Sequence, residues 1–176
     1  MITYKSSLKK IKKNKIKIDN EIILSKDSVN RISTININSP NNYPSADNSA
    51  YDGFALSSKD TKNITYKKNK KFKILKTLAA GDNPYIKKTN KYSTVEVMTG
   101  AIIRKPFDTI IPVEKIKFYP NKVNPKYVVI NKKLKKNEYI RFKGSDYRKG
   151  DRVVNKGELI TASHILAFKT LGIKKV

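Results

Sequence analysis

The stretch DNSAYDGFA, residues 47–55, organises the rest of the chain because it can be neither a regular helix nor a simple strand. It places two carboxylates, an amide, a hydroxyl and a glycine around the start of an apolar run at Phe54. Asp, Asn and Gly favour turns, where short polar side chains bond the local backbone or the residue adopts a positive φ. The stretch therefore predicts a shaped loop that leads into a strand.

Two chemical interpretations of this loop are open. Asp47 and Asp52 offer hard oxygen ligands for a cation, or acceptors for the hydroxyl and amine groups of a ligand. Alternatively, Asp47 or Asn48 forms an Asx turn and only satisfies backbone N–H groups, which is the commoner use of such side chains. Taken alone, the loop favours the second interpretation.

The segment before the loop predicts a helix and then a strand. Tyr4, Leu8 and Ile11 recur at i, i+4 and i+7, which predicts an amphipathic helix over about residues 3–14. Apolar and polar residues alternate toward the end of residues 29–37, which predicts a half-buried strand there.

Two other stretches of this segment give no regular element. Apolar residues recur irregularly over 16–24, which leaves an extended connection and a short helix as alternatives. Residues 40–44 begin and end with proline and contain two asparagines, so they predict a turn that delivers the chain to the loop. We place a domain boundary there.

Beyond the loop, short apolar runs alternate with turn residues. Strands are expected at 54–56, 72–78, 95–98, 108–113 and 128–130. Several short strands separated by Gly, Pro, Asn and Lys predict a mostly β module across about residues 46–140.

The tail changes character. Residues 152–160 predict a β-hairpin, because Asn-Lys-Gly stands between two apolar runs. Thr161 and Gly172 are good N- and C-terminal caps for a helix over 162–171. The only histidine, His164, lies in the first turn of this helix, and we interpret it as a surface or packing residue.

Composition bounds the class of protein. A chain of 176 residues with 38% apolar content suits one ordinary domain or two small ones. The absence of cysteine excludes disulfides, thiolate metal sites and a cysteine nucleophile. The lysine-rich start is not a convincing secretory signal, and no apolar run approaches the roughly 18 residues that span a bilayer. We expect a soluble, cytoplasmic protein with no membrane partner.

The net charge of +25 invites comparison with nucleic-acid-binding proteins. The lysines, however, are spread through nearly every segment, and arginine, which reads bases bidentately, is scarce. The sequence contains no recognisable nucleic-acid-binding motif. We therefore expect weak, salt-sensitive adhesion to polyanions and no specific nucleic-acid partner.

Four stretches together resemble the molybdopterin molybdenumtransferase family, which includes MoeA and the E domain of gephyrin. The loop at 47–55 resembles its DNSAMDGYA signature, LAAG at 78–81 its AAG segment, and VMTGA at 97–101 its IMTGA segment. KGSD at 143–146, with the later Lys149-Gly150-Asp151 and Gly157, resembles its G-E-D…G-D…G pattern. The four stretches occur in the family's order.

The resemblance implies an α+β fold in which a mostly β domain is inserted into a small α/β linker domain. The linker domain would comprise residues 1–45 plus 141–176, and the inserted domain residues 46–140. The resemblance runs from about Ile22 to Val176 and covers the first half of the family. The pterin-binding domain and the C-terminal β-domain are absent, so we expect an N-terminal fragment or a truncated homologue.

The resemblance also implies a function. Family members insert molybdate into adenylyl-molybdopterin with Mg²⁺ present and release AMP, in molybdenum cofactor biosynthesis. They are homodimers in which the inserted domain of one subunit faces the pterin-binding domain of the other. We therefore expect adenylyl-molybdopterin and molybdate as substrates, Mg²⁺ as cofactor, and a homodimer or a separate pterin-binding partner. The chain by itself is expected to be inactive.

By resemblance, the catalytic residues are Asp52, Thr99 and Asp146, with Asp52 also the candidate metal ligand. The candidate cofactor-binding residues are Asp47, Asn48, Ser49, Gly53 and Gly100. Two alternatives from other classes stay open. One is a noncatalytic dimerisation or docking module of molybdenum-cofactor assembly, and the other is a basic nucleic-acid-binding protein.

Overall fold

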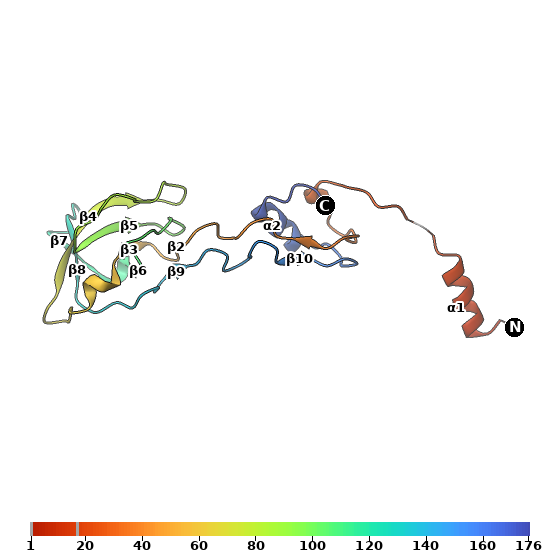
Figure 1. Cartoon of the computed structure of the whole chain (residues 1–176), viewed down its shortest axis with the longest axis horizontal. Helices are drawn as coiled ribbons and strands as arrows, with labels where there is room; N and C mark the ends of the chain where they lie inside the picture. Colours follow the sequence, from red (N-terminus) through yellow and green to blue (C-terminus); the bar gives the residue numbers. More distant parts are fainter. Residues whose placement is uncertain (1, 17) are drawn as a thin grey trace. The chain divides into compact units, whose positions relative to one another are not determined.

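The structure is a computed structural model that describes residues 2–16 and 18–176. It contains two compact units, which can be followed by residue colour in Figure 1. The β unit comprises Ser39–Asp151, and the terminal unit comprises the described residues up to Asn38 together with Arg152–Val176. The α+β class expected from the sequence is confirmed.

The boundaries of the units differ from the sequence-based division at 45/46 and 140/141. Tyr43 pairs with Tyr147 in an antiparallel bridge, and Gly144 donates its N–H to the Pro44 carbonyl at 2.9 Å. The backbone N–H of Lys149 donates to Asn42 Oδ1 at 3.0 Å. The segment around Tyr43 and the segment around Tyr147 are therefore bonded to each other, and both belong to the β unit.

The β unit is built on one six-stranded sheet in the order β6-β3-β5-β4-β8-β7. All neighbours in it are antiparallel except β4 and β5, which are parallel. The strands are β3 (Gly53–Leu56), β4 (Lys70–Leu78), β5 (Ser93–Val97), β6 (Thr109–Pro112), β7 (Lys117–Tyr119) and β8 (Tyr127–Ile130). The sequence prediction of β3, β4, β5, β6 and β8 is confirmed, and β7 was missed.

Short 3-10 helices and a small second ladder complete the elements described here. The ladder pairs β2 (Asn48–Ser49) with β9 (Ile140–Arg141). The 3-10 helices are η1 (Ser25–Asp27) in the terminal unit, and η2 (Ser58–Thr61) and η3 (Val113–Lys115) in the β unit.

The sheet contributes to two buried clusters. Phe54 belongs to a cluster with Phe72 and Val128, whereas its neighbour Ala55 belongs to a second cluster with Ile110. Successive side chains of a strand point to opposite faces, so β3 contributes to both cores. Full burial of Phe54 contributes about 1.5–3 kcal/mol to stability.

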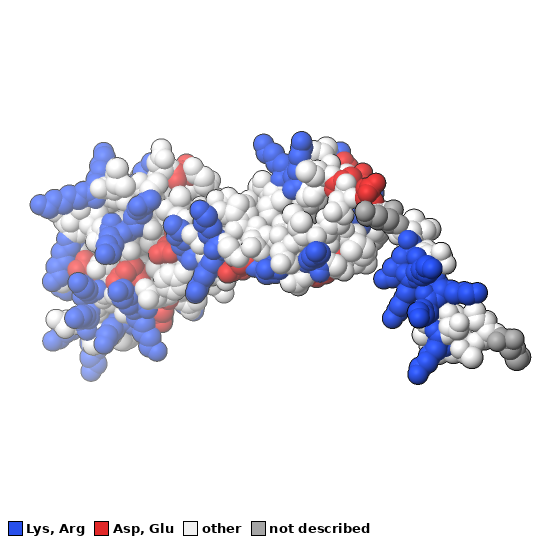
Figure 2. Space-filling view, turned by 45° about the vertical axis from the view of Figure 1, so that its right-hand side comes forward, with Lys and Arg blue, Asp and Glu red and all other residues white. Residues whose placement is uncertain are grey.

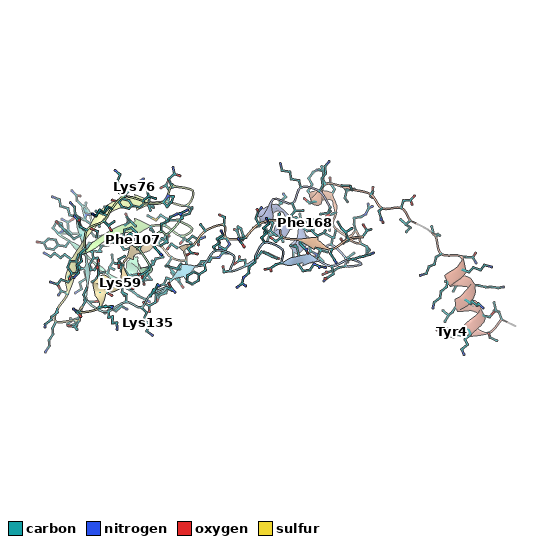
Figure 3. The ribbon with its side chains drawn as sticks, viewed as in Figure 1. Tyr4, Lys59, Lys76, Phe107, Lys135 and Phe168 are labelled. Atoms are coloured by element: carbon teal, nitrogen blue, oxygen red, sulfur yellow. The ribbon has the colours of Figure 1, made fainter. Side chains whose placement is uncertain are left out.

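A short ladder, isolated bridges and helix α2 (Ala162–Leu171) hold the terminal unit together. Strand β1 (Ile37–Asn38) pairs antiparallel with β10 (Arg152–Val154). Helix α2 has the predicted bounds, and Gly172 ends it in the left-handed conformation at φ 75°. Phe168 is fully buried in this unit, and Figure 3 shows it on α2.

Two sequence predictions in this unit are wrong. The strand expected over 29–37 is reduced to β1 and an isolated bridge between Ile32 and Leu159. The hairpin expected over 152–160 keeps its turn, with Gly157 at φ 83°, but its two arms pair with the segment around β1. Local alternation indicates extended chain and cannot identify the strand's partner.

The N-terminal segment contains the predicted helix, α1 (Tyr4–Lys13), which buries none of its residues. From residue 18 to 23 the chain is non-helical, and Ile23 exchanges two backbone hydrogen bonds with Val176. The extended alternative therefore holds for the described part of 16–24, and Lys17 lies outside it. Among the described helices, none has the length and apolar character needed to cross a membrane.

Candidate functional site

Three motifs meet at one end of the six-stranded sheet. Gly53, the first residue of β3, pairs with Val97 at the end of β5 and with Pro112 at the end of β6. Strand β4 runs parallel to β5, so its last residue, Leu78, lies at the same end of the sheet. The loops that precede β3 and follow β4, β5 and β6 are therefore neighbours. They bring together the signature loop at 47–55, LAAG at 78–81 and VMTGA at 97–101, and we call this group of loops the loop cluster.

Asp52 and Thr99 are in direct contact at this end of the sheet. Asp52 Oδ1 accepts hydrogen bonds from the Thr99 backbone N–H at 2.6 Å and from Thr99 Oγ1 at 2.7 Å. These two hydrogen bonds hold the pKa of Asp52 below the ordinary value of 3.8, and the bond from the Thr99 N–H is the larger cause. Both side chains are exposed, so this is an ionised carboxylate on an open surface.

The two glycines predicted at the site serve close backbone packing. A Cβ on Gly53 would overlap the Ile111 carbonyl oxygen of the neighbouring strand. Gly100 adopts φ 87°, and its N–H donates to the Ser49 carbonyl at 2.8 Å. A contact of either glycine with a cofactor stays a prediction.

Asp47, Asn48 and Ser49 hold the signature loop in place, partly through contacts with residues far away in the sequence. Asp47 Oδ1 accepts from the Lys143 backbone N–H at 2.8 Å, and Asn48 pairs with Arg141 across the short ladder. The hydroxyl of Ser49 donates to the Tyr51 carbonyl. These contacts shape the loop, and a cofactor-binding role for the three residues stays a prediction.

Asp146 lies in the β unit but is joined to other partners. It forms an ion pair with Arg141, which also places its guanidinium 5.5 Å from the centre of the Tyr43 ring. No hydrogen bond within residues 2–16 and 18–176 joins Asp146 to Asp52 or Thr99. Arg141, one of the chain's few arginines, was not among the predicted residues, although it precedes Asp146 by only five positions.

Lys115 and Tyr139 adjoin the signature loop and were also not predicted from the sequence. Lys115 Nζ donates to Tyr139 Oη at 2.7 Å, and the ring of Tyr139 packs edge-on against Tyr51 at 5.0 Å. The bond to the phenol raises the pKa of Lys115. No spacing pattern in the sequence connects these residues: Lys115 ends η3, Tyr51 lies in the signature loop, and Tyr139 directly precedes β9.

The described residues contain no group of three or more His, Cys, Asp or Glu side chains that could hold a metal ion. Of the two carboxylates in the signature loop, Asp52 is exposed, whereas Asp47 is partly buried and accepts from the Lys143 N–H. On the face drawn in Figure 2, lysine and arginine are spread over the β unit with acidic residues between them, whereas over α1 they gather without acidic residues.

The fold and the site define an α+β protein in which a β unit, inserted into a discontinuous terminal unit, presents an oxygen-rich loop cluster at its strand ends. The sequence model of the MoeA N-terminal region, domains I and II, matches residues 2–172. The chain therefore belongs to the MoeA N-terminal region family.

Relatives and solved structures agree with this assignment. The chain is 31% identical over 150 residues to a molybdopterin molybdenumtransferase of Haemophilus influenzae, covering 85% of this chain and 35% of that protein. It is 27% identical over 175 residues to one of Staphylococcus epidermidis, covering 99% of this chain and 40% of the relative. The chain thus spans well under half the length of these relatives.

Two crystal structures of the molybdopterin biosynthesis MoeA protein from Pyrococcus horikoshii share the fold. One superposes with a TM-score of 0.83 at 26% identity, covering 98% of this chain and 42% of that one. The other gives a TM-score of 0.86 at 25% identity, covering 100% and 45%.

Proposed function

We propose that this chain supplies the N-terminal part of a molybdopterin molybdenumtransferase in molybdenum cofactor biosynthesis. In this function molybdate is inserted into adenylyl-molybdopterin and AMP is released. The observation that carries the proposal is the Asp52–Thr99 contact, because it joins two family motifs at one end of one sheet. The matched relatives, which are molybdopterin molybdenumtransferases, support it.

The reaction requires that the two substrates be positioned and that their negative charge be neutralised. Both substrates are anions, and release of AMP opens a phosphoanhydride on which negative charge develops. The hydrogen bonds from Thr99 favour the ionised form of Asp52, so the carboxylate is suited to holding a cation or accepting from a ligand. It is poorly suited to donating a proton near neutral pH.

Mg²⁺ is the cofactor of this proposal. Mg²⁺ commonly binds through one or two carboxylates, with water and substrate phosphates as its other ligands. Asp52 fits that role because it is exposed, and because only Oδ1 accepts hydrogen bonds from the described residues. When bound, the ion polarises phosphoryl oxygens.

The partners follow from the same proposal. The loop cluster would form one wall of a pocket whose other wall is a pterin-binding domain, either in a homodimer of longer subunits or in a separate chain. A cytoplasmic location suits this biosynthetic role.

The test is AMP release from adenylyl-molybdopterin with molybdate and Mg²⁺. We expect release when the chain is mixed with a separately made pterin-binding half of a relative, and none from the chain alone. Asp52→Ala should lower the rate roughly a hundredfold, as loss of a charge-stabilising group does. Asp27→Ala, an exposed aspartate of the terminal unit, is the matched control. A folded mixture that releases no AMP would contradict the proposal.

A second candidate function is a noncatalytic docking module of molybdenum-cofactor assembly. A pocket of about 390 Å³ in the terminal unit, lined by Leu24, Phe168 and Ile173 among others, favours it. Sedimentation velocity of the chain with and without the pterin-binding half tests it. Complex formation without AMP release would support docking over catalysis.

A further inference from the structure

Lys115 stands at the same end of the sheet as Asp52 and Thr99, although none of the four family-like stretches contains it. Strand β6 ends at Pro112, opposite Gly53, and η3 follows at once. The N–H of Val113, the first residue of η3, donates to the Asp52 carbonyl at 3.1 Å. The main chain thus fixes the start of η3 to the signature loop two residues before Lys115.

The side chain of Lys115 is fixed to the same loop by a second route. Its ammonium donates to Tyr139 Oη, and the Tyr139 ring packs against Tyr51 of the loop. The Tyr139 carbonyl accepts from the Ala50 N–H at 3.0 Å. A lysine side chain normally loses much rotamer freedom when it binds a ligand, and these contacts reduce that loss in advance.

The ammonium of Lys115 forms no ion pair among the described residues. Within residues 2–16 and 18–176, no carboxylate oxygen lies within 4.0 Å of its ammonium. The phenol of Tyr139 takes one of the three N–H donors of the ammonium. Two donors remain for a ligand on this exposed surface.

The backbone that presents Tyr139 is strained. Asn137 and Tyr139 adopt φ 68° and 58°, the left-handed region that residues other than glycine rarely occupy. The strain is retained by bonds to β6 and the residue before it: the Asn137 N–H donates to the Asp108 carbonyl, and the Ile110 N–H to the Glu138 carbonyl. Retained strain of this kind concentrates at functional sites.

We propose that Lys115 is an oxyanion-binding residue of the loop cluster, positioned by Tyr139. The ligand chemistry is a tetrahedral oxyanion, which a lysine binds as a point charge with several donors. The proposal rests on the proposed function for the source of that oxyanion, which is either molybdate or a phosphate of the adenylylated substrate.

Anion binding to the full chain tests the proposal directly. Molybdate, inorganic phosphate and AMP are titrated separately into the ¹⁵N-labelled protein, and dissociation constants are taken from amide shifts. Lys115→Gln should weaken binding at least about fivefold, in line with the loss of one charge-assisted contact. Lys117→Gln, an exposed lysine two positions on, should change it less than about twofold. Whether molybdate, or phosphate and AMP, respond to Lys115→Gln identifies the source.

Tyr139→Phe tests the positioning role. It keeps the ring packed on Tyr51 but removes the hydroxyl that holds the ammonium. We expect weaker anion binding by about two- to threefold, with an otherwise unchanged amide spectrum. Equal weakening by Lys115→Gln and Lys117→Gln, or none by Lys115→Gln, would overturn the proposal in favour of diffuse surface charge.

AMP release separates this proposal from the proposed function. If release depends on Asp52 while Lys115→Gln matches the wild type in release and anion binding, the oxyanion role of Lys115 is overturned and the proposed function stands. If the wild-type mixture releases no AMP but Lys115→Gln still weakens anion binding, the oxyanion role stands and the proposed function fails.

Discussion

The β unit and the terminal unit bury apolar surface to very different degrees. The β unit contains two buried clusters, in which side chains such as Phe54, Phe72 and Ile110 are fully buried. The terminal unit buries Phe168 and Leu171 on α2, but both hydrophobic core clusters of the described residues belong to the β unit. Large apolar side chains are exposed in both units, for example Leu166 in the terminal unit and Ile86 in the β unit. The candidate site is built on the unit with the larger buried core, which is where fixed geometry is easiest to maintain.

The largest expected effect comes from emptying each core in turn. Phe54 and Phe168 are both fully buried. Phe54→Ala should cost about 3–5 kcal/mol of the β unit's stability, and Phe168→Ala about 3 kcal/mol in the looser terminal unit. Urea unfolding followed by amide signals of each unit measures both. If either substitution shifted both units together, the units would form one cooperative structure and the comparison would fail.

Two glycines give the next largest contrast. Gly53→Ala forces a Cβ against the Ile111 carbonyl, and should cost about 3 kcal/mol in the β unit. Gly157→Ala, in the terminal unit, meets no atom within 4 Å but must keep a φ of 83°. It should cost about 1 kcal/mol. Thermal unfolding of the two variants checks the order, and equal losses would remove the distinction between steric and conformational cost.

Acid should weaken both units through one carboxylate in each. The pKa of Asp52 is lowered by Thr99, and that of Glu158 by the N–H and side-chain amide of Asn155. A carboxylate with a lowered pKa in the folded protein stabilises it above the unfolded value, and this stabilisation is lost as pH falls through the folded value. The losses begin near the ordinary values of 3.8 and 4.5 and continue below them.

Unfolding curves between pH 6 and pH 2.5, followed separately for each unit, measure these losses. Asp52→Asn should flatten the acid limb of the β unit only, and Glu158→Gln that of the terminal unit only. A Glu158→Gln effect on the β unit would show that the two titrations are coupled.

The smallest expected effect separates the two Thr99 contacts. Thr99→Val removes the hydroxyl but keeps the backbone N–H, which is the larger cause of the lowered Asp52 pKa. The pKa of Asp52 should therefore rise only part of the way toward 3.8, as followed by ¹³C NMR of the carboxyl group. Thr77→Val, which removes a hydroxyl bonded to Glu96, is the control and should leave Asp52 unchanged.

Sequence patterns predicted elements better than they predicted partners. Helix α2 and most strands of the β unit follow from periodicity and capping, because those signals are local. The arms around Gly157 extend as predicted, yet they pair with chain about 120 positions earlier, as the contact between Lys156 and Asn36 shows.

The residues of the candidate site likewise fall into those that the sequence predicted and those that it did not. Asp52 and Thr99 were grouped by family resemblance, and the structure brings them into contact. Arg141 and Lys115 were missed because each reaches the loop cluster through strand pairing, which no spacing in the sequence encodes. The roles of Asp146 and of the cofactor-binding residues stay predictions.

The close packing of Gly53 has a genetic consequence. Every missense change that a single base can make in a glycine codon yields a residue with a Cβ, and any Cβ here meets the Ile111 carbonyl. Selection for folding alone would therefore keep residue 53 glycine in each generation, whatever the neighbouring aspartate binds. An invariant glycine at this position would reveal nothing about the ligand, and variation at Asp52 or Lys115 would be the informative record.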